Sequence, residues 1–183
     1  MHDPSTGTTG APAFSTVRIR VGAALFCGER VCVIRRDRPA GALYTLPGGK
    51  VEPGEPLEGA LARELSEELR LEAASWDGPP ELLWVQDQMV ARPGPTPPPR
   101  KLHLVYRLHI GEEARGRLAE EEHDAAPNGR GDTGRVEWRD YRTVGDLALF
   151  PAVGGQIAGL ETPVSRPDRT LAPPMTDITF SWR

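Results

Sequence analysis

Hydrophobic and polar positions alternate in two short runs near the start of the chain. The run VRIRVGAALF follows Thr16, and the run VCVIRR follows a turn at Gly28 and Glu29. Alternation with a period of two around a short glycine-containing turn is typical of paired strands. The pattern predicts a β-hairpin that begins directly after Thr16.

A helical period replaces this alternation between Pro56 and Leu71. Proline suits the first turn of a helix, where its missing N–H is harmless. Four leucines fall on one stripe of the helical wheel: Leu57, Leu61, Leu65 and Leu69. Two carboxylates, Glu64 and Glu68, intrude on this stripe, and Glu67 lies beside it. The apolar stripe is expected to pack on a sheet, so these carboxylates need an explanation.

Carboxylates that face the interior require a cation. Burying an ionised carboxylate costs several kcal/mol unless it is paired, and neither Arg63 nor Arg70 is placed on the wheel to neutralise both Glu64 and Glu68. Oxygen ligands without Cys or His select a hard ion, Mg²⁺ or Mn²⁺. Residues 48–71 also hold six glutamates against three cationic side chains. The alternative is a glutamate-rich helix that is simply solvated.

Two further strands are predicted downstream, ELLWVQDQMV and KLHLVYRLHI, separated by the proline-rich loop ARPGPTPPPR. In the second strand the apolar side chains share one face: Leu102, Leu104, Tyr106, Leu108 and Ile110. The other face is basic and carries Lys101, His103, Arg107 and His109. This basic face either lines a cleft for an anionic substrate or is a solvated outer face.

The remainder of the chain is less regular. Residues 111–135 are polar and glycine-rich, contain Glu120 to Glu122, and are expected to form a long loop before the strand RVEWRDY. A second helix is predicted near Val144 to Leu160. The end of the chain, TDITFSWR, has the alternation of a strand.

Length and composition indicate one domain. The 183 residues include 19 Pro and 20 Gly, so part of the chain must be loops and tails. We expect a flexible arm over residues 1–15, a domain over residues 16–160, and a C-terminal tail over residues 161–183. Cys27 and Cys32 lack the partners of a zinc site and are interpreted as core thiols.

Charge and hydropathy exclude several classes of function. A net charge of −4 without any basic run argues against nucleic-acid binding. No apolar run approaches the roughly 18 residues of a membrane span, and the first residues lack the features of a signal peptide. We therefore expect a cytoplasmic protein that does not bind membranes.

The segment LPGGKVEPGEPLEGALARELSEELRL resembles the Nudix box, in which glycine, glutamate, arginine and paired glutamates recur at fixed spacings. The matching residues are Gly49, Glu55, Arg63, Glu64, Leu65, Glu67, Glu68 and Leu71. The resemblance covers about residues 17–150 and implies an α/β fold, a Nudix-type α/β/α sandwich with a mixed sheet. Arg70 replaces a glycine that usually serves as a left-handed cap, so the helix end is expected to differ.

The resemblance also implies a site and a reaction. Glu64 and Glu68 should bind Mg²⁺, or Mn²⁺, with Glu67 as a further ligand and the carbonyl of Gly49 completing the set. Glu55 and Arg63 should form a structural ion pair. The implied activity is the hydrolysis of a diphosphate linkage in a small nucleoside diphosphate-type substrate: a nucleoside triphosphate, a sugar nucleotide or ADP-ribose.

The general base and the competing functions stay open. The base is Glu67, a member of the Glu120 to Glu122 cluster, or Asp132, which we prefer. The alternatives are a nucleotide-binding regulatory domain without catalysis and an isoprenoid-diphosphate isomerase. The intact glutamates argue against the first, and cysteines buried in strands argue against the second. A homodimer is compatible with the resemblance, because many family members are dimers.

Overall fold

The computed structural model describes residues 16–91, 97–123 and 133–177. The expected N-terminal arm and Asp132 lie outside the described residues, as does the chain after Asp177. The strands are β1 (Val17–Cys27), β2 (Arg30–Arg38), β3 (Gly41–Thr45), β4 (Glu81–Met89), β5 (Arg100–His109), β6 (Glu121–His123), β7 (Thr133–Asp140), β8 (Leu149–Phe150) and β9 (Met175–Thr176). The helices are α1 (Leu57–Leu69), η1 (Ala73–Ser75), α2 (Glu112–Arg115), η2 (Tyr141–Asp146) and α3 (Gly154–Ala158).

The strands form one mixed sheet in the order β6-β7-β2-β1-β5-β4-β9, with β3 beside β2 and β8 beside β3. The predicted hairpin is present: β1 and β2 are antiparallel, and Gly28 turns between them with a φ of 56°. At the centre, β1 runs parallel to β5 over ten residue pairs. In the described part of the chain, no helix is long and apolar enough to span a membrane.

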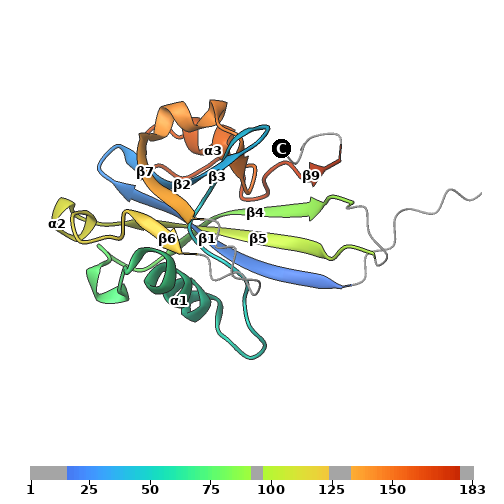
Figure 1. Cartoon of the computed structure of the whole chain (residues 1–183), viewed down its shortest axis with the longest axis horizontal. Coiled ribbons are helices and arrows are strands. Elements are labelled where there is room, and N and C mark those ends of the chain that lie inside the picture. The colour runs from blue at the N-terminus through green and yellow to red at the C-terminus, as the bar shows by residue number, and fades with distance from the viewer. Residues whose placement is uncertain (1–15, 92–96, 124–132, 178–183) are drawn as a thin grey trace, which may run out of the picture.

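Two layers cover the two faces of this sheet (Figure 1). On one face the leucines of α1 pack against β1 and β5, together with Val21, Leu25 and Leu108. On the other face, η2 and α3 pack against Phe26, Val33 and Trp84. The predicted α/β sandwich with a mixed sheet is confirmed. Both cysteines are free and buried in the α1 layer, where burial raises the pKa of each thiol.

The end of α1 keeps the geometry that glycine would supply. Arg70 adopts a left-handed conformation with a φ of 57°. Its N–H donates to the Ser66 carbonyl at 3.0 Å, and the Leu71 N–H donates to the Leu65 carbonyl at 3.1 Å. The expectation of a different helix end was therefore wrong. Tertiary packing of Leu71, which is buried, imposes the cap despite the side chain of Arg70.

The face of β5 that points away from α1 is covered by other residues and carries both polar and apolar side chains. His103 and Arg107 are buried, and Val105 belongs to the core beneath η2 and α3. The interpretation as a solvated outer face was wrong for these residues, because residues after Asp140 fold back over the sheet. The helix predicted near Val144 to Leu160 is also interrupted, since β8 and Pro151 separate η2 from α3.

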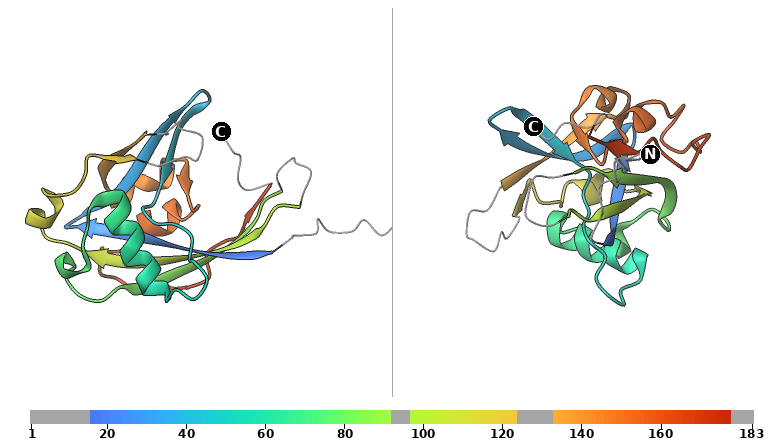
Figure 2. Two further views of the ribbon diagram at one scale, coloured as in Figure 1. Left: turned by 60° about the horizontal axis from the view of Figure 1, so that its bottom comes forward. Right: turned by 90° about the vertical axis from the view of Figure 1, so that its right-hand side faces the viewer.

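The C-terminal segment continues along the outer side of β4. Its strand β9 runs parallel to the end of β4, pairing Gln88 with Met175 and Met89 with Thr176. Two views of the molecule show this segment returning past α3 to the edge of the sheet (Figure 2). The described part of the segment thus covers an edge of β4 that would otherwise expose unpaired backbone groups.

Candidate functional site

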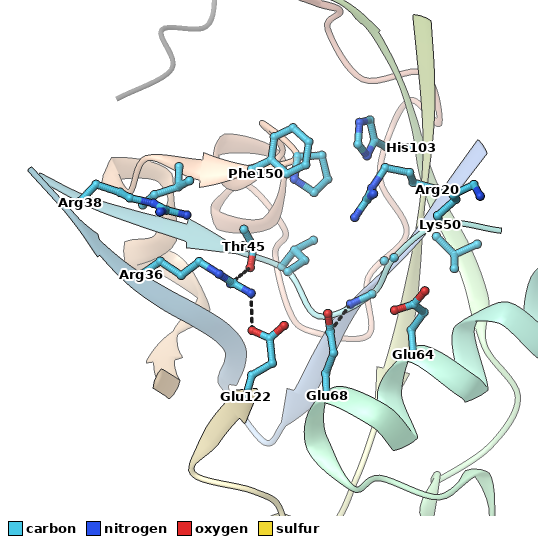
Figure 3. A pocket seen from close by; sticks show the side chains of 17 residues that line it. Arg20, Arg36, Arg38, Thr45, Lys50, Glu64, Glu68, His103, Glu122 and Phe150 are labelled. Atoms are coloured by element: carbon cyan, nitrogen blue, oxygen red, sulfur yellow. Dashed lines mark hydrogen bonds and ion pairs between the residues drawn. The ribbon is translucent and has the colours of Figure 1, made fainter. Parts of the chain in front are cut away.

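A cavity of about 410 Å³ opens where β2 and β3 diverge from β1 and β5. Three carboxylates lie at one end of it, from Glu64 and Glu68 on α1 and Glu122 on β6 (Figure 3). His103 and Phe150 lie at the opposite end. Cationic side chains stand on the walls between the two ends: Arg20, Arg36, Arg38 and Lys50. This combination suits an anionic ligand held against a cation on the carboxylates.

The loop before α1 brings its backbone to the carboxylates. Gly48 has a φ of 134° and lies against the backbone of Val21, so any side chain there would clash. Its N–H donates to a carboxylate oxygen of Glu68 at 2.7 Å. A methyl group on the next residue, Gly49, would overlap the carboxyl group of Glu64. The glycines therefore let two backbone units and two carboxylates share a small volume.

Glu68 is strongly perturbed in this setting. Burial raises the pKa of its carboxyl group, and the nearby carboxylates of Glu122 and Glu64 raise it further. The hydrogen bond from the Gly48 N–H acts in the opposite direction but does not prevail. A carboxyl group in this environment ionises readily only if positive charge is brought next to it.

Arg63 binds glutamate side chains on the outer side of the same helix. Its Nε donates to Glu55 at 2.9 Å and its Nη2 donates to the second oxygen of Glu55 at 3.1 Å, so the expected ion pair is present and bidentate. Its Nη1 donates to Glu64 at 2.9 Å and contacts Glu67 at 3.3 Å. Arg63 thus reaches one of the two inward carboxylates, while Glu68 keeps its position beside Gly48.

Glu67 has a different environment from Glu64 and Glu68. Its side chain is 61% exposed, against 15% for Glu64. It does not line the cavity, and it accepts a hydrogen bond from Arg63 on the outer side of the helix. The position of Glu67 on the wheel, beside the apolar stripe rather than on it, already indicated this difference.

Glu122 reaches the cavity from β6, a strand at one edge of the sheet. Its side chain forms a buried ion pair with Arg36 and lies near enough to Glu68 to raise the pKa of that carboxyl group. Arg36 is 8% exposed and also donates to the Thr45 hydroxyl at 3.2 Å. Of the cluster Glu120 to Glu122, only Glu122 lines the cavity.

The opposite end of the cavity carries two aromatic rings. The rings of His103 and Phe150 meet edge to face at 4.9 Å, and the Nε2 atom of His103 lies 2.7 Å from the Gln88 side-chain oxygen. Burial lowers the pKa of His103 to about 3, with the charges of Arg20 and Lys101 adding to the effect. His103 is therefore neutral near pH 7. Neither Cys27 nor Cys32 lines this cavity.

The oxygen atoms at the carboxylate end of the cavity suit Mg²⁺. Within the described residues no group of three or more Asp, Glu, His or Cys side chains is assembled tightly enough to hold a metal alone. Mg²⁺ nevertheless takes only a few protein oxygens and fills its shell with water and substrate phosphates. Glu64, Glu68 and the Gly49 carbonyl, which also accepts from the Val21 N–H at 2.9 Å, fit that demand.

Comparison with a curated relative is limited to a short stretch. The chain is 49% identical over 59 residues to a protein named "Putative 8-oxo-dGTP diphosphatase 2" from Mycobacterium tuberculosis. This stretch is 31% of the present chain and 42% of the relative. The chain thus spans less than half the length of the curated relative it matches.

Solved structures agree with the fold. A MutT protein from Bacillus halodurans is similar with a TM-score of 0.54 and 16% identity, over 76% of this chain and 79% of that one. The NUDIX domain of Shewanella oneidensis NrtR, complexed with ADP ribose, has a TM-score of 0.53 and 20% identity over 86% and 89%. The family model described as the NUDIX domain matches residues 16–152. Together with the glutamate pattern of α1, this match shows that the chain belongs to the Nudix family.

Proposed function

We propose that the protein is a Mg²⁺-dependent hydrolase that cleaves a diphosphate linkage in a nucleotide-type substrate. The observation that carries the proposal is the meeting of Glu64, Glu68 and Glu122 at one end of a cavity whose walls bear cationic side chains. Carboxylates that face one cavity repel one another in the protein alone, and a divalent cation bound among them would make the arrangement favourable.

Glu64, Glu68 and the Gly49 carbonyl would hold the metal. When bound, a divalent ion neutralises charge on diphosphate oxygens and lowers the pKa of water. We assign Glu67 a secondary role, through water or through Arg63, because its side chain is mostly exposed. Mn²⁺ would satisfy the same oxygen ligands.

Glu122 is our candidate for the group that accepts the proton of the attacking water. It lines the cavity beside Glu68, whereas Glu67 does not. Arg36 holds one oxygen of Glu122 and leaves the carboxylate in a fixed orientation. Asp132, which we prefer from the sequence, lies outside the described residues and is the competing candidate.

The cationic wall is assigned to the phosphates. Arg38 and Lys50 are exposed at the cavity, and Arg20 lies on β1 opposite His103. Guanidinium groups bind phosphate oxygens through paired hydrogen bonds. The aromatic end at His103 and Phe150 would then receive the remainder of the substrate. Because the mycobacterial relative is named an 8-oxo-dGTP diphosphatase, nucleoside triphosphates are the first candidates to test.

The proposal is tested with a panel of nucleoside triphosphates, sugar nucleotides and ADP-ribose, with and without Mg²⁺, by quantifying released phosphate, pyrophosphate and nucleotide. We expect Mg²⁺-dependent cleavage of at least one class, and loss of that activity in Glu68→Gln. Glu58→Gln, an exposed residue of the same helix, is the matched control and should retain it. Nucleotide binding without cleavage by the wild-type protein would favour a regulatory domain instead.

A further inference from the structure

The C-terminal segment, residues 161–177, lies beyond the family match yet is built into the described fold. The Val85 N–H donates to the Thr170 carbonyl at 2.8 Å, and the Ala172 N–H donates to the Val85 carbonyl at 3.0 Å. The Tyr141 hydroxyl donates to the Glu161 carbonyl at 3.0 Å. These contacts hold the segment against β4 and η2 at several points.

One buried side chain connects this segment to the wall of the cavity. Gln86 on β4 is 1% exposed, and its amide makes three hydrogen bonds. Its Oε1 accepts from the Ala152 N–H at 2.8 Å, while its Nε2 donates to the Ala152 carbonyl at 3.0 Å and to the Pro173 carbonyl at 2.9 Å. Both amide hydrogens are thus used, and the orientation of the amide is determined by its partners.

The backbone that Gln86 holds adjoins the cavity directly. Phe150 and Pro151, which precede Ala152, line the end of the cavity opposite the carboxylates (Figure 3). The next inward residue of the same strand, Gln88, supports the other side of this wall through His103, whose ring meets that of Phe150. Alternate residues of β4 therefore support one wall from behind.

We propose that Gln86 is a positioning residue for substrate binding, which holds the Phe150–Pro151 wall and joins it to the C-terminal segment. The inference rests on the hydrolase function proposed above. Gln86 does not line the cavity and acts through the backbone of Ala152. Since the wall lies away from the carboxylates, its displacement weakens binding of the substrate and leaves the chemical step largely intact.

The test compares Gln86→Met, Gln86→Glu and Tyr141→Phe on the full chain, using the nucleotide that the wild-type protein hydrolyses best. Gln86→Met keeps the volume and removes all three hydrogen bonds. Gln86→Glu, whose carboxyl group is protonated when buried, keeps the acceptor for Ala152 and only one of the two donors, so it serves if the Met variant does not fold. Tyr141→Phe removes one hydrogen bond to the same C-terminal segment but none to the wall.

We expect KM to rise roughly tenfold in both Gln86 variants, with kcat within about twofold of the wild type. Tyr141→Phe should lower the melting temperature and leave KM unchanged. Combining Gln86→Met with Phe150→Leu should raise KM by less than the product of the single effects, because both act through one wall.

Three results would overturn the inference. An unchanged KM in a folded Gln86 variant would reduce Gln86 to a structural role, as would an equal rise in KM in Tyr141→Phe. If the double variant Gln86→Met with Phe150→Leu raised KM by the full product of the two single effects, Gln86 would act at a place other than the Phe150–Pro151 wall. If the wild-type protein hydrolysed none of the substrates, the proposed function would fail together with this inference. Failure of the inference alone would instead show a wild-type protein that is active and Gln86 variants with an unchanged KM.

Discussion

The carboxylates at one end of the cavity are held from two sides. One side is formed by α1 and the loop before it, and the other by the strands β2 and β6. On the helix side, Arg63 contacts Glu55, Glu64 and Glu67, all within a short stretch of chain, and its side chain is 33% exposed. On the strand side, Arg36 pairs with Glu122, which is 86 residues away in the sequence and 3% exposed. The helix side is assembled by local spacing, whereas the strand side depends on the completed sheet. The same pair of residue types therefore contributes very differently to stability and to the site.

The largest contrast should appear when the two arginines are removed. Arg36→Met leaves the buried Glu122 carboxylate beside Glu68 without its guanidinium partner, and should lower the free energy of unfolding by about 3 to 5 kcal/mol. Arg63→Met removes partly exposed pairs and should cost about 1 kcal/mol. Urea unfolding of both variants measures the difference. Equal losses would show that burial does not distinguish the two sides.

Alanine substitutions at two closely packed glycines, Gly134 on the strand side and Gly49 on the helix side, test the same contrast. A methyl group at Gly134 would overlap the side chains of Ile34 and Glu122, so Gly134→Ala should cost about 1 to 3 kcal/mol. At Gly49, an added methyl group would first meet the carboxyl end of the flexible Glu64 side chain, so Gly49→Ala should impair Mg²⁺-dependent turnover more than stability. Gly155→Ala, with open space around it, is the control in thermal unfolding. A stable Gly134→Ala protein would argue against a tightly fixed strand side.

His103 extends the comparison to the aromatic end of the cavity. Its pKa is about 3 in the folded protein and near 6.5 in the unfolded chain, so its neutral form stabilises the fold above pH 6.5. Protons bind preferentially to the unfolded state as the pH falls from 6.5 towards 3. Relative to His103→Gln, the wild-type protein should lose about 1 kcal/mol between pH 7 and 5.5. Parallel pH profiles of the two proteins would contradict the buried, neutral state.

The smallest expected effect concerns the cap of α1. Arg70 occupies a left-handed conformation that costs a side chain other than glycine or asparagine about 1 kcal/mol. Arg70→Gly should therefore stabilise the protein by up to about 1 kcal/mol and leave turnover unchanged, as measured by urea unfolding and a kinetic assay. Destabilisation would show that the Arg70 side chain makes a compensating contact.

The helix side could be predicted from the sequence because its information is local. The leucine stripe of α1 and the spacing of Glu55 and Arg63 are sufficient for a helix, a loop and an ion pair. Glu122 could not be selected from three consecutive glutamates, since its partner Arg36 lies on another strand. The second face of β5 was equally ambiguous, because His103 and Arg107 are buried by residues that follow much later in the chain.

The C-terminal segment shows the same limit. The strand predicted from TDITFSWR lies mostly outside the described residues, and nothing in the sequence relates Pro173 to Ala152 or either residue to Gln86. These three meet only after β4 has been placed at the edge of the sheet. A glutamine within a run of strand residues carries no visible sign of such a role.

The metal site is best tested by using electron paramagnetic resonance to measure Mn²⁺ binding to the wild-type, Glu68→Gln and Glu67→Gln proteins. The claim is that the inward carboxylates of α1, with the Gly49 carbonyl, hold a divalent cation. We predict that Glu68→Gln weakens binding by at least roughly tenfold and that Glu67→Gln has the smaller effect. Without metal, Glu68→Gln should change the melting temperature little, because the pKa of the Glu68 carboxyl group is already raised by burial and the neutral amide has the same shape. Unchanged Mn²⁺ affinity in Glu68→Gln, or a larger loss in Glu67→Gln, would contradict the account.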